Sequence, residues 1–522
     1  MITHLVPVVF SISEVFDIER ITENPDISFS FEAQPQKKEP LHLYDTFDWR
    51  AWNKNTAIIL SRNQLNLIAI DNGKKVSSVG FRRTPQSFFP EEIPDDKTRS
   101  SLQAFSKPRA FLRYGTVSTL SQSMRVLDRN MKTVATIEIR SILPSSAQEQ
   151  EQKRFITLTP VRGFHKEFGK LTRHILTKPS YAETTTYRNF FLALLDAVSC
   201  QPGINASKTP VKLHPDNTIV DSARELLLST LAVIHANETW IPKNIDTEFL
   251  HDYRVAIRRT RSILARLQGI LPPEELLTYK QSFRELGRRT NDLRDQDVYL
   301  LEADRFRELL PPAMRNSLNL FFTDLRNRHK KELRSFSRHI ASEKHKRFLQ
   351  EWESFLRSDP QSDPDRTPEA RRITSDVAVA SIRKAWKKVL RHGRTTSPEA
   401  TDTELHALRL DCKKLRYLLE FYSSLFPRKT LRQVVRQLKN LQDNLGLFVD
   451  LSVQQDYLTT YLSSLECDEE VIPLAASIGG LVTALHHKRE AVRKEFHHRF
   501  EKFDRTETET MFNELFKPYR QP

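Results

Sequence analysis

Cysteine and glycine are scarce in this 522-residue chain, and long apolar runs are missing. The sequence holds 3 Cys and 12 Gly, which excludes a disulfide framework and a collagen-like composition. No stretch approaches the roughly 20 consecutive apolar residues that a membrane-spanning helix needs, and residues 1–10 lack the basic segment that opens a secretory signal. With 39% hydrophobic residues, the sequence predicts a folded cytoplasmic protein that has no membrane partner.

Positive charge is what the chain has in excess. Lys and Arg together number 81 against 66 Asp and Glu, which gives a net charge of +15. Such an excess favours a polyanionic partner, but composition alone does not say which one. Cys200, Cys412 and Cys467 lie far apart and form no metal-ligand spacing. We therefore predict no metal site and no cofactor, and the low cysteine content is typical of a reducing compartment.

The pattern of apolar and turn-forming residues changes near residue 200. Before it, short β-branched or alternating runs are separated by turn-forming pieces such as Asp71-Asn72-Gly73, which predicts antiparallel strands and hairpins. The clearest runs are Leu5–Ile12, Ala57–Leu60, Leu65–Ile70, Thr133–Ile139 and Phe155–Leu158. A polar segment, Ser145–Lys153, is expected to be an exposed loop. This part of the chain is therefore predicted to be mainly sheet.

Beyond residue 215 the apolar residues recur at helical spacing and prolines interrupt the pattern, so this half is predicted to be helical throughout. The fold class is accordingly α+β with two domains. We expect a β-rich domain over residues 1–200, a linker over 201–215 and an α-helical domain over 216–516.

The helical half contains an internal repeat with a fixed offset. The segment from His251 to Arg261 matches the segment that begins 155 residues later, at His406. The offset persists downstream, where it pairs Arg284 with Lys439 and Asp295 with Asp450. A repeat in constant register means that one structural unit occurs twice. The copies are expected over about residues 216–357 and 371–516, with a linker over 358–370.

Each copy gathers cations on one side of a helix. At about 100° per residue, four side chains of the first copy share an arc of about 80°: His251, Arg254, Arg258 and Arg261. Tyr253 and Ile257 lie on a separate apolar stripe that is expected to face the core, and Arg259 stands apart from both. The second copy places four side chains in the same way: His406, Arg409, Lys413 and Arg416. A row about 15 Å long suits several successive anionic groups, and mixed Arg and Lys can follow a flexible chain of phosphates.

A basic stripe on a single helix is ordinarily a solvated face, and a lone His beside an apolar stripe is ordinarily a buried hydrogen-bonding residue. Two copies with identical spacing, each led by His, favour phosphate contact over these ordinary roles. Asp295 and Asp450 are expected to neutralise part of the row as ion-pair partners when no ligand is bound.

These segments resemble the CHAD family, the conserved-histidine α-helical domain, in which His-x-x-Arg-x-x-x-(Arg/Lys)-(Arg/Lys)-x-Arg opens a helix in each of two repeated four-helix units. The resemblance covers about residues 215–516. It implies a pseudo-two-fold helical bundle whose basic inner surface binds inorganic polyphosphate and places the protein on polyphosphate granules. Carried over by position, it implies this binding set: His251, Arg254, Arg258, Arg259, Arg261, His406, Arg409, Lys413, Lys414 and Arg416. Less strictly matched rows supply the weaker candidates Lys330, Lys331, Lys439 and Lys488.

The β-rich half resembles a CYTH-type triphosphate tunnel domain. Tyr44-Asp45-Thr46, followed by Asp48, is similar to that family's Tyr-x-Asp-Thr region, and an Arg-bearing helix is expected near Arg109. Active members open with a Glu-x-Glu-x-Lys strand, but here the first strand is apolar, and so is Leu65–Ile70, where the family has alternating Arg. A tunnel that lacks these groups has no clear way to polarise a phosphoryl group. The resemblance therefore implies a degenerate tunnel or barrel without catalytic residues.

Three functions remain in competition. The first is non-enzymatic binding of inorganic polyphosphate by the helical domain. The second is metal-dependent hydrolysis of a triphosphate or polyphosphate by the N-terminal domain, which would use carboxylates such as Glu32 and Glu138. The third is nucleic-acid binding, which is less favoured because base stacking requires aromatic residues within the basic row, whereas Tyr253 falls on the apolar side. The oligomeric state is left open.

Overall fold

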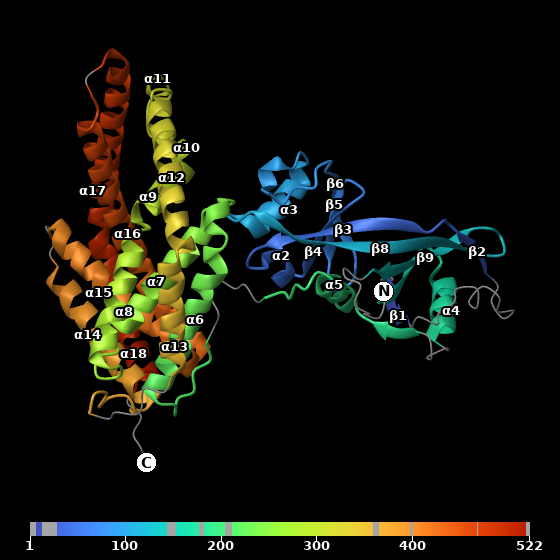
Figure 1. Cartoon of the computed structure of the whole chain (residues 1–522), viewed down its shortest axis with the longest axis horizontal. Helices are drawn as coiled ribbons and strands as arrows, with labels where there is room; N and C mark the ends of the chain where they lie inside the picture. Colours follow the sequence, from blue (N-terminus) through green and yellow to red (C-terminus); the bar gives the residue numbers. More distant parts are fainter. Residues whose placement is uncertain are drawn as a thin grey trace. The chain divides into compact units, whose positions relative to one another are not determined.

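The computed structural model describes residues 7–12, 29–143, 153–176, 182–203, 211–358, 365–396, 400–466 and 468–517. It forms two compact units, Met1–Ser207 and Lys208–Pro522, called here the β unit and the helical unit (Figure 1). The predicted loop at Ser145–Lys153, apart from Lys153 itself, lies outside the described residues, as do the central parts of both predicted linkers.

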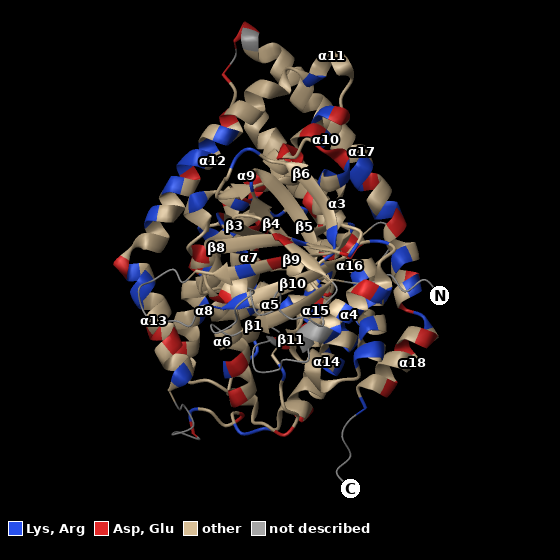
Figure 2. Ribbon diagram, turned by 90° about the vertical axis from the view of Figure 1, so that its right-hand side faces the viewer, with Lys and Arg blue, Asp and Glu red and all other residues tan. Residues whose placement is uncertain are grey.

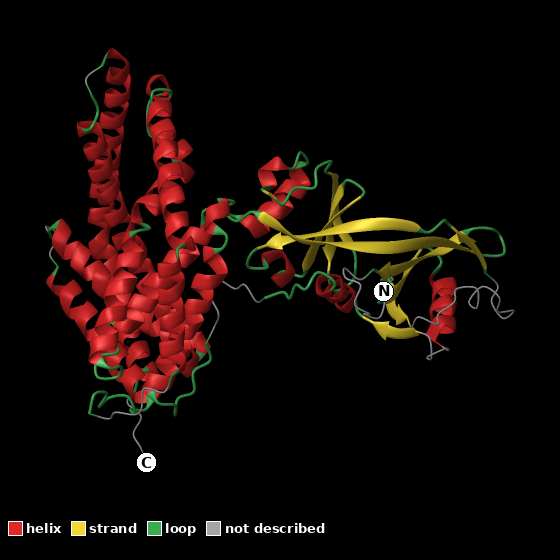
Figure 3. Ribbon diagram, in the orientation of Figure 1, coloured by secondary structure: helices red, strands yellow, loops and turns green. Residues whose placement is uncertain are grey.

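An eleven-stranded antiparallel sheet forms the β unit (Figure 3). Its strands pair in the order β11-β1-β10-β9-β8-β3-β4-β5-β6, and β2 and β7 also pair with β8. The strands are β1 (Val8–Ile12), β2 (Ser30–Ala33), β3 (Lys37–Thr46), β4 (Thr56–Ser61), β5 (Gln64–Ala69), β6 (Lys75–Gly80), β7 (Ser87–Phe88), β8 (Phe111–Leu127), β9 (Thr133–Ile142), β10 (Arg154–Pro160) and β11 (Ala182–Thr185).

The described parts of the predicted runs lie in strands β1, β4, β5, β9 and β10, which confirms those predictions; Leu5 and Val6 of the first run lie outside the described residues. The predicted Asp71-Asn72-Gly73 turn joins β5 to β6, and Gly73 adopts a φ of 65° that glycine tolerates without steric cost. The longest strand, β8, was not predicted. It carries several Ser, Thr and Gln residues, so its alternation of buried and exposed positions does not appear as an alternation of apolar and polar residues.

Short helices cover the sheet. Phe168 and Leu171 of α4 (His165–Leu176) pack on buried residues of β1, β8, β9 and β10. Leu194 of α5 (Tyr187–Asp196) belongs to a second cluster with residues of β3 and β4. Leu102 of α3 (Asp96–Ser106) and Ala51 of α2 (Arg50–Asn53) complete a third cluster with β3, β4 and β5. The predicted antiparallel β domain is thus confirmed, with its helices packed against the sheet.

The helical unit consists of two sets of helices. The first set is α6 (Ile219–Glu238), α7 (Glu248–Leu264), α8 (Pro273–Arg288), α9 (Asn291–Leu301), α10 (Ala303–Glu308), α11 (Pro312–Arg315), α12 (Leu318–Ala341) and α13 (Glu343–Arg357). The second set is α14 (Thr374–Thr395), α15 (Asp402–Phe421), α16 (Arg428–Ser463), α17 (Ile472–Phe503) and α18 (Thr506–Leu515). No helix in the described part of the chain has an apolar stretch that could cross a bilayer.

The two sets follow the predicted repeat. Helices α14 and α16 begin 155 residues after α6 and α8, and α15 begins within one residue of that offset from α7. Helix α16 continues through the position where the first set breaks between α8 and α9. Each copy therefore has four principal segments and ends in a further helix, α13 or α18. Figure 1 shows that α12 and α17, the fourth segment of each copy, project from the unit, with α11 at the tip of the part that contains α12.

A pseudo-two-fold axis relates the two copies. The Ile219 amide donates to the Arg372 carbonyl at 2.8 Å, and the Thr374 amide donates to the Asn217 carbonyl at 2.9 Å. Positions 374 and 372 are the repeat equivalents of 219 and 217, so each bond is the counterpart of the other. Such reciprocity is the signature of a two-fold interface. The start of each copy is therefore joined to the start of its counterpart.

Candidate anion-binding site

Helices α7 and α15 carry the two predicted rows of cations. Each helix buries an apolar stripe, with Tyr253 and Leu408 both at 0% exposure. Helix α15 begins with a capping box, in which the Glu404 amide donates to the Thr401 hydroxyl and the Glu404 carboxylate accepts from the Thr401 amide. The buried stripes orient the basic faces away from the core, as the helical spacing predicted.

Arg254 lies against the C-terminal end of α8. Its Nη1 donates to the Thr290 hydroxyl at 2.6 Å and to the Gly287 carbonyl at 3.3 Å, and both terminal nitrogens donate to the Asn291 side chain at 3.1 Å. Burial, together with the positive charges of Arg258 and Arg294, lowers the pKa of Arg254 to about 10. These partners are neutral, so Arg254 is held in place while its charge remains uncompensated by direct contact.

The equivalent side chain in the second copy, Arg409, has a charged partner. Its Nη2 lies 3.2 Å from the Asp450 carboxylate, so the predicted ion pair forms. Asp295, the equivalent of Asp450, makes no ion pair among the described residues, although the charge of Arg254 acts on it. Desolvation raises the pKa of Asp295, and the neighbouring carboxylates of Asp292 and Asp450 act in the same direction. The axis therefore brings two aspartates together beside the rows.

The two rows meet at Arg258 and Lys413, which are equivalent positions. Burial, together with the charges of Arg409, Arg258 and Arg416, lowers the pKa of Lys413 to about 8. Arg258 likewise acts on Arg254 in its own copy. Helices α7 and α15 contact each other, and Arg258 acts on groups in both copies, so the two cationic rows lie near one another. The cationic faces of α7 and α15 are together called here the basic row.

Several members of the basic row lack an acidic partner. In the described part of the chain no ion pair involves Arg258, Arg261 or Lys413. Arg416, in contrast, lies 2.8 Å from Glu420 and 3.4 Å from the Gln442 side-chain oxygen. The surface thus concentrates positive charge in its first copy and along the axis.

Two further arginines, Arg284 and Arg288, extend this surface from α8. Desolvation lowers the pKa of Arg261, and the charges of Arg284 and Arg288 lower it further, which places all three side chains near one another. The sequence repeat paired Arg284 with Lys439 but did not assign either residue of α8 to the site. The relevant signal is their spacing around Gly287, which places both on the side of α8 that faces α7.

Arg259 and Lys414, which resemblance alone assigned to the binding set, point to other partners. Arg259 lies 3.5 Å from Glu420 of the second copy, and Lys414 lies 3.5 Å from the buried carboxylate of Asp411. Asp411 also pairs with Lys388 at 2.9 Å. Both cations therefore have an acidic partner in the structure. Each lies off the arc of its row, as the helical wheel predicted for position 259.

The two histidines open the rows in different surroundings. His251 is partly buried, whereas His406 is exposed. The weaker candidates Lys330, Lys331 and Lys439 are exposed, and Lys488 is partly buried. Lys330 belongs to a separate basic stripe on α12 with Arg334 and Arg338, and these residues line a shallow pocket with Pro242 and Leu333. Figure 2 shows Lys and Arg along α12 and α17.

The β unit uses its predicted motif residues internally. Asp45 is buried and accepts backbone hydrogen bonds from Thr46, Ala51 and Trp52 at 2.7 to 3.0 Å. Burial raises the pKa of Asp45 to about 7, against the effect of these three bonds. Arg109 lies three residues beyond α3, is fully buried, and has its Nε 3.9 Å from the Asp48 carboxylate. These side chains therefore stabilise the turn between β3 and β4.

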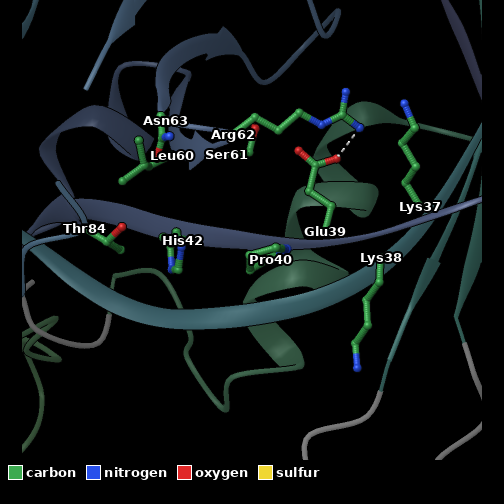
Figure 4. A pocket seen from close by; sticks show the side chains of 10 residues that line it. All are labelled: Lys37, Lys38, Glu39, Pro40, His42, Leu60, Ser61, Arg62, Asn63 and Thr84. Carbon is green, nitrogen blue, oxygen red and sulfur yellow. Dashed lines mark hydrogen bonds and ion pairs between the residues drawn. The ribbon is translucent and has the colours of Figure 1, made fainter. Parts of the chain in front are cut away.

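The carboxylates considered for catalysis are also engaged. Glu32 pairs with Arg125, and Glu138 pairs with Arg140. Strand β8 separates them, because β2 and β9 lie on its two sides. A surface pocket elsewhere in the sheet is crossed by a 2.8 Å ion pair between Glu39 and Arg62 (Figure 4). Among the residues that the structure describes, no cluster of His, Cys, Asp and Glu has the arrangement of a metal site.

Comparison with known proteins found similarities within the helical unit. A family model of the CHAD domain matches residues 225–459. The structure is similar to a crystal structure of the CHAD domain from the plant Ricinus communis, with 20% identity and a TM-score of 0.47 over 56% of this chain and 95% of that one. It is also similar to PptA from Streptomyces chartreusis, with 15% identity and a TM-score of 0.41 over 55% of this chain and 100% of that one. A search of curated proteins found no match.

Proposed function

We propose that the helical unit, in which a CHAD-domain model matches residues 225–459, binds inorganic polyphosphate without converting it chemically. The observation that carries the proposal is that the two cationic rows lie near one another across the pseudo-two-fold axis. Arg258 acts electrostatically on Arg254 in its own copy and on Lys413 in the other. A ligand with charges at regular intervals can contact all of these groups at once.

When no anion is bound, the close positive charges of the basic row are unfavourable for the free energy of the folded protein. Like charges at short distances repel, and partial burial raises the cost of keeping them ionised. Burial and its cationic neighbours lower the pKa of Lys413, as expected for a group that is harder to keep ionised. A bound polyanion would remove it, because phosphoryl oxygens accept charge-assisted hydrogen bonds from Arg and Lys. Anion binding therefore accounts for a surface that stability alone would disfavour.

The length and composition of the row favour a linear phosphate polymer. Residues 254 to 261 of α7 span about 10 Å at 1.5 Å per residue, and the row continues onto α15. Both aromatic residues of α7, Phe249 and Tyr253, are fully buried. No stacking platform for bases is therefore present on that helix, which disfavours single-stranded nucleic acid. Binding of this kind would also place the protein on polyphosphate granules.

For the β unit we propose a role without catalysis. The groups that could hold a metal or polarise a phosphoryl group are occupied in ion pairs or in backbone contacts, as at Glu32, Glu138 and Asp45. Release of phosphate from tripolyphosphate in the presence of Mg²⁺ or Mn²⁺ tests this proposal. Turnover that is lost in Glu32→Gln or Glu138→Gln would overturn it.

The test of polyphosphate binding replaces four residues of the row, Arg254, Arg258, Arg409 and Lys413, by Ala in the full chain. We expect helicity to be retained and polyphosphate affinity to fall at least about a hundredfold, since each lost phosphate contact costs about 1 kcal/mol or more. A control removes four positive charges from exposed positions of the β unit: Lys74, Lys75, Arg82 and Arg83.

Titrations at several salt concentrations complete the test. Because each phosphate contact releases counterions, the row variant should also show a shallower dependence of affinity on salt. Unchanged affinity with intact helicity would overturn the proposal. So would tighter binding of single-stranded RNA than of polyphosphate across the salt series.

A further inference from the structure

The two copies differ in charge where α7 and α15 meet the following helix. Arg284 and Arg288 of α8 correspond to Lys439 and Asp443 of α16. In the first copy Arg261 makes no ion pair among the described residues, whereas its equivalent, Arg416, is paired with Glu420 at 2.8 Å. The pseudo-symmetric surface therefore has one end that is distinctly more positive than the other.

The geometry of this end depends on Gly287. A Cβ atom at that position would lie 3.2 Å from Arg261 Nη1, so the guanidinium rests directly over the backbone of α8. Arg284 and Arg288 are one helical turn apart and flank Gly287 on the same side of α8. Three guanidinium groups thus converge on one region. The second copy has Gln442 in place of Gly287, and its side-chain oxygen lies 3.4 Å from Arg416.

The chemistry of polyphosphate distinguishes its ends from its interior. An internal phosphoryl group has two free oxygens and one negative charge, whereas a terminal group has three free oxygens. The terminal group also carries a second negative charge above a pKa of about 6, a value similar to that of a phosphate monoester. Arg presents a planar fork of donors that suits such a group. A site with several unpaired guanidiniums therefore matches a chain end better than a chain interior.

We propose that Arg261, Arg284 and Arg288, called here the end cluster, bind the terminal phosphoryl group of a linear polyphosphate. The rest of the chain then follows Arg258 towards Lys413 and Arg409 of the second copy. This proposal rests on the proposed function of the helical unit and adds that binding has a direction. The end cluster binds one end of the ligand, and the opposite end of the basic row contacts internal phosphoryl groups.

The experiment compares linear tetraphosphate with cyclic hexametaphosphate, which has no ends but carries the same full charge. Both are titrated at pH 8 against the full chain, the double variant Arg284→Ala/Arg288→Ala and a control, Arg436→Ala/Lys439→Ala. The control removes two exposed positive charges from the corresponding helix of the second copy. We expect wild type to bind the linear form about tenfold more tightly, since one or two charge-assisted contacts are worth about that factor.

The double variant should lose this preference and bind both ligands alike, whereas the control should weaken both by the same factor and keep the preference. Equal binding of linear and cyclic phosphate by wild type would overturn the proposal, as would an equal loss for both ligands in the double variant. If wild type bound neither ligand, the proposed function itself would fail, so the two failures are distinguishable.

A terminal phosphoryl group can belong to polyphosphate or to a nucleotide, and a titration with adenosine triphosphate distinguishes the two. A polyphosphate site should bind linear tripolyphosphate more tightly than adenosine triphosphate, because the adenosine interrupts the path along the basic row. Tighter binding of the nucleotide, with the same dependence on Arg284 and Arg288, would assign the end cluster to nucleotides and overturn the proposal.

Discussion

Lys413 offers a quantitative test of the strain in the basic row. Its pKa falls from the ordinary 10.5 to about 8 because the site is partly desolvated and because Arg409, Arg258 and Arg416 repel its charge. Replacing it by Met keeps a similar length and apolar stem but removes the ammonium group. The substitution should therefore stabilise the folded protein in the absence of ligand and weaken polyphosphate binding.

The magnitude and its pH dependence follow from linkage. A lysine whose folded pKa is lowered destabilises the protein below the folded pKa, because protonation then favours the unfolded chain. This penalty disappears as the pH rises from about 8 towards 10.5. Without screening the shift would correspond to about 3 kcal/mol. Since Lys413 is partly exposed, solvent screening reduces the expected gain for Lys413→Met to about 1 to 2 kcal/mol near pH 7.

The assay is urea unfolding of wild type and Lys413→Met at pH 7 and pH 10, in low salt and without phosphate, followed by a signal from the helical unit. The difference in the free energy of unfolding should be largest at pH 7, shrink at pH 10 and decrease with added salt. Lys439→Met, at an exposed position of α16, should change stability by less than about 0.5 kcal/mol. A Lys413→Met protein that is less stable than wild type at pH 7, or whose gain does not depend on pH, would refute the reasoning.

Three further substitutions probe the site and the scaffold. Asp450→Asn frees Arg409 from its ion pair and should raise polyphosphate affinity by about two- to fivefold in low salt, since exposed pairs are worth up to about 1 kcal/mol; a fall in affinity on titration would contradict this role. Gly393→Ala places a Cβ against the Phe500 ring and should lower the free energy of unfolding by about 1 to 3 kcal/mol. Gly446→Ala, at a helical glycine with open space around it, should raise that energy by about 0.5 to 1 kcal/mol in the same denaturation assay, and equal effects of the two substitutions would contradict the packing argument.

The architecture of the helical unit was largely predictable because the sequence repeats at a constant offset. The offset between His251 and His406 also locates the beginnings of α14 and α16 relative to α6 and α8. The break between α8 and α9 was not predictable in this way. There the copies diverge, since Thr290 and Asn291, which hold Arg254 in the first copy, are replaced by Leu445 and Gly446 in the second.

The composition of the site was only partly predictable because a helical wheel describes one helix at a time. It identified the arc that contains Arg258 and Lys413, and it separated Arg259 from that arc. It could not show that Arg259 of the first copy would form an ion pair with Glu420 of the second. Nor could it show that α8 would place Arg284 and Arg288 near Arg261. Those contacts depend on how neighbouring helices pack.

The pseudo-two-fold axis has a consequence for how charge can be distributed in such a molecule. In a symmetric homodimer, a residue beside the axis lies opposite its own copy. An arginine there always faces an arginine, and an aspartate always faces an aspartate. Here both halves are encoded in one polypeptide, and each member of a facing pair can change independently. The contrast between Gly287 and Gln442, or between Arg288 and Asp443, is not available to a symmetric homodimer. A single chain can thereby combine a binding surface as broad as that of a dimer with two ends that differ in charge.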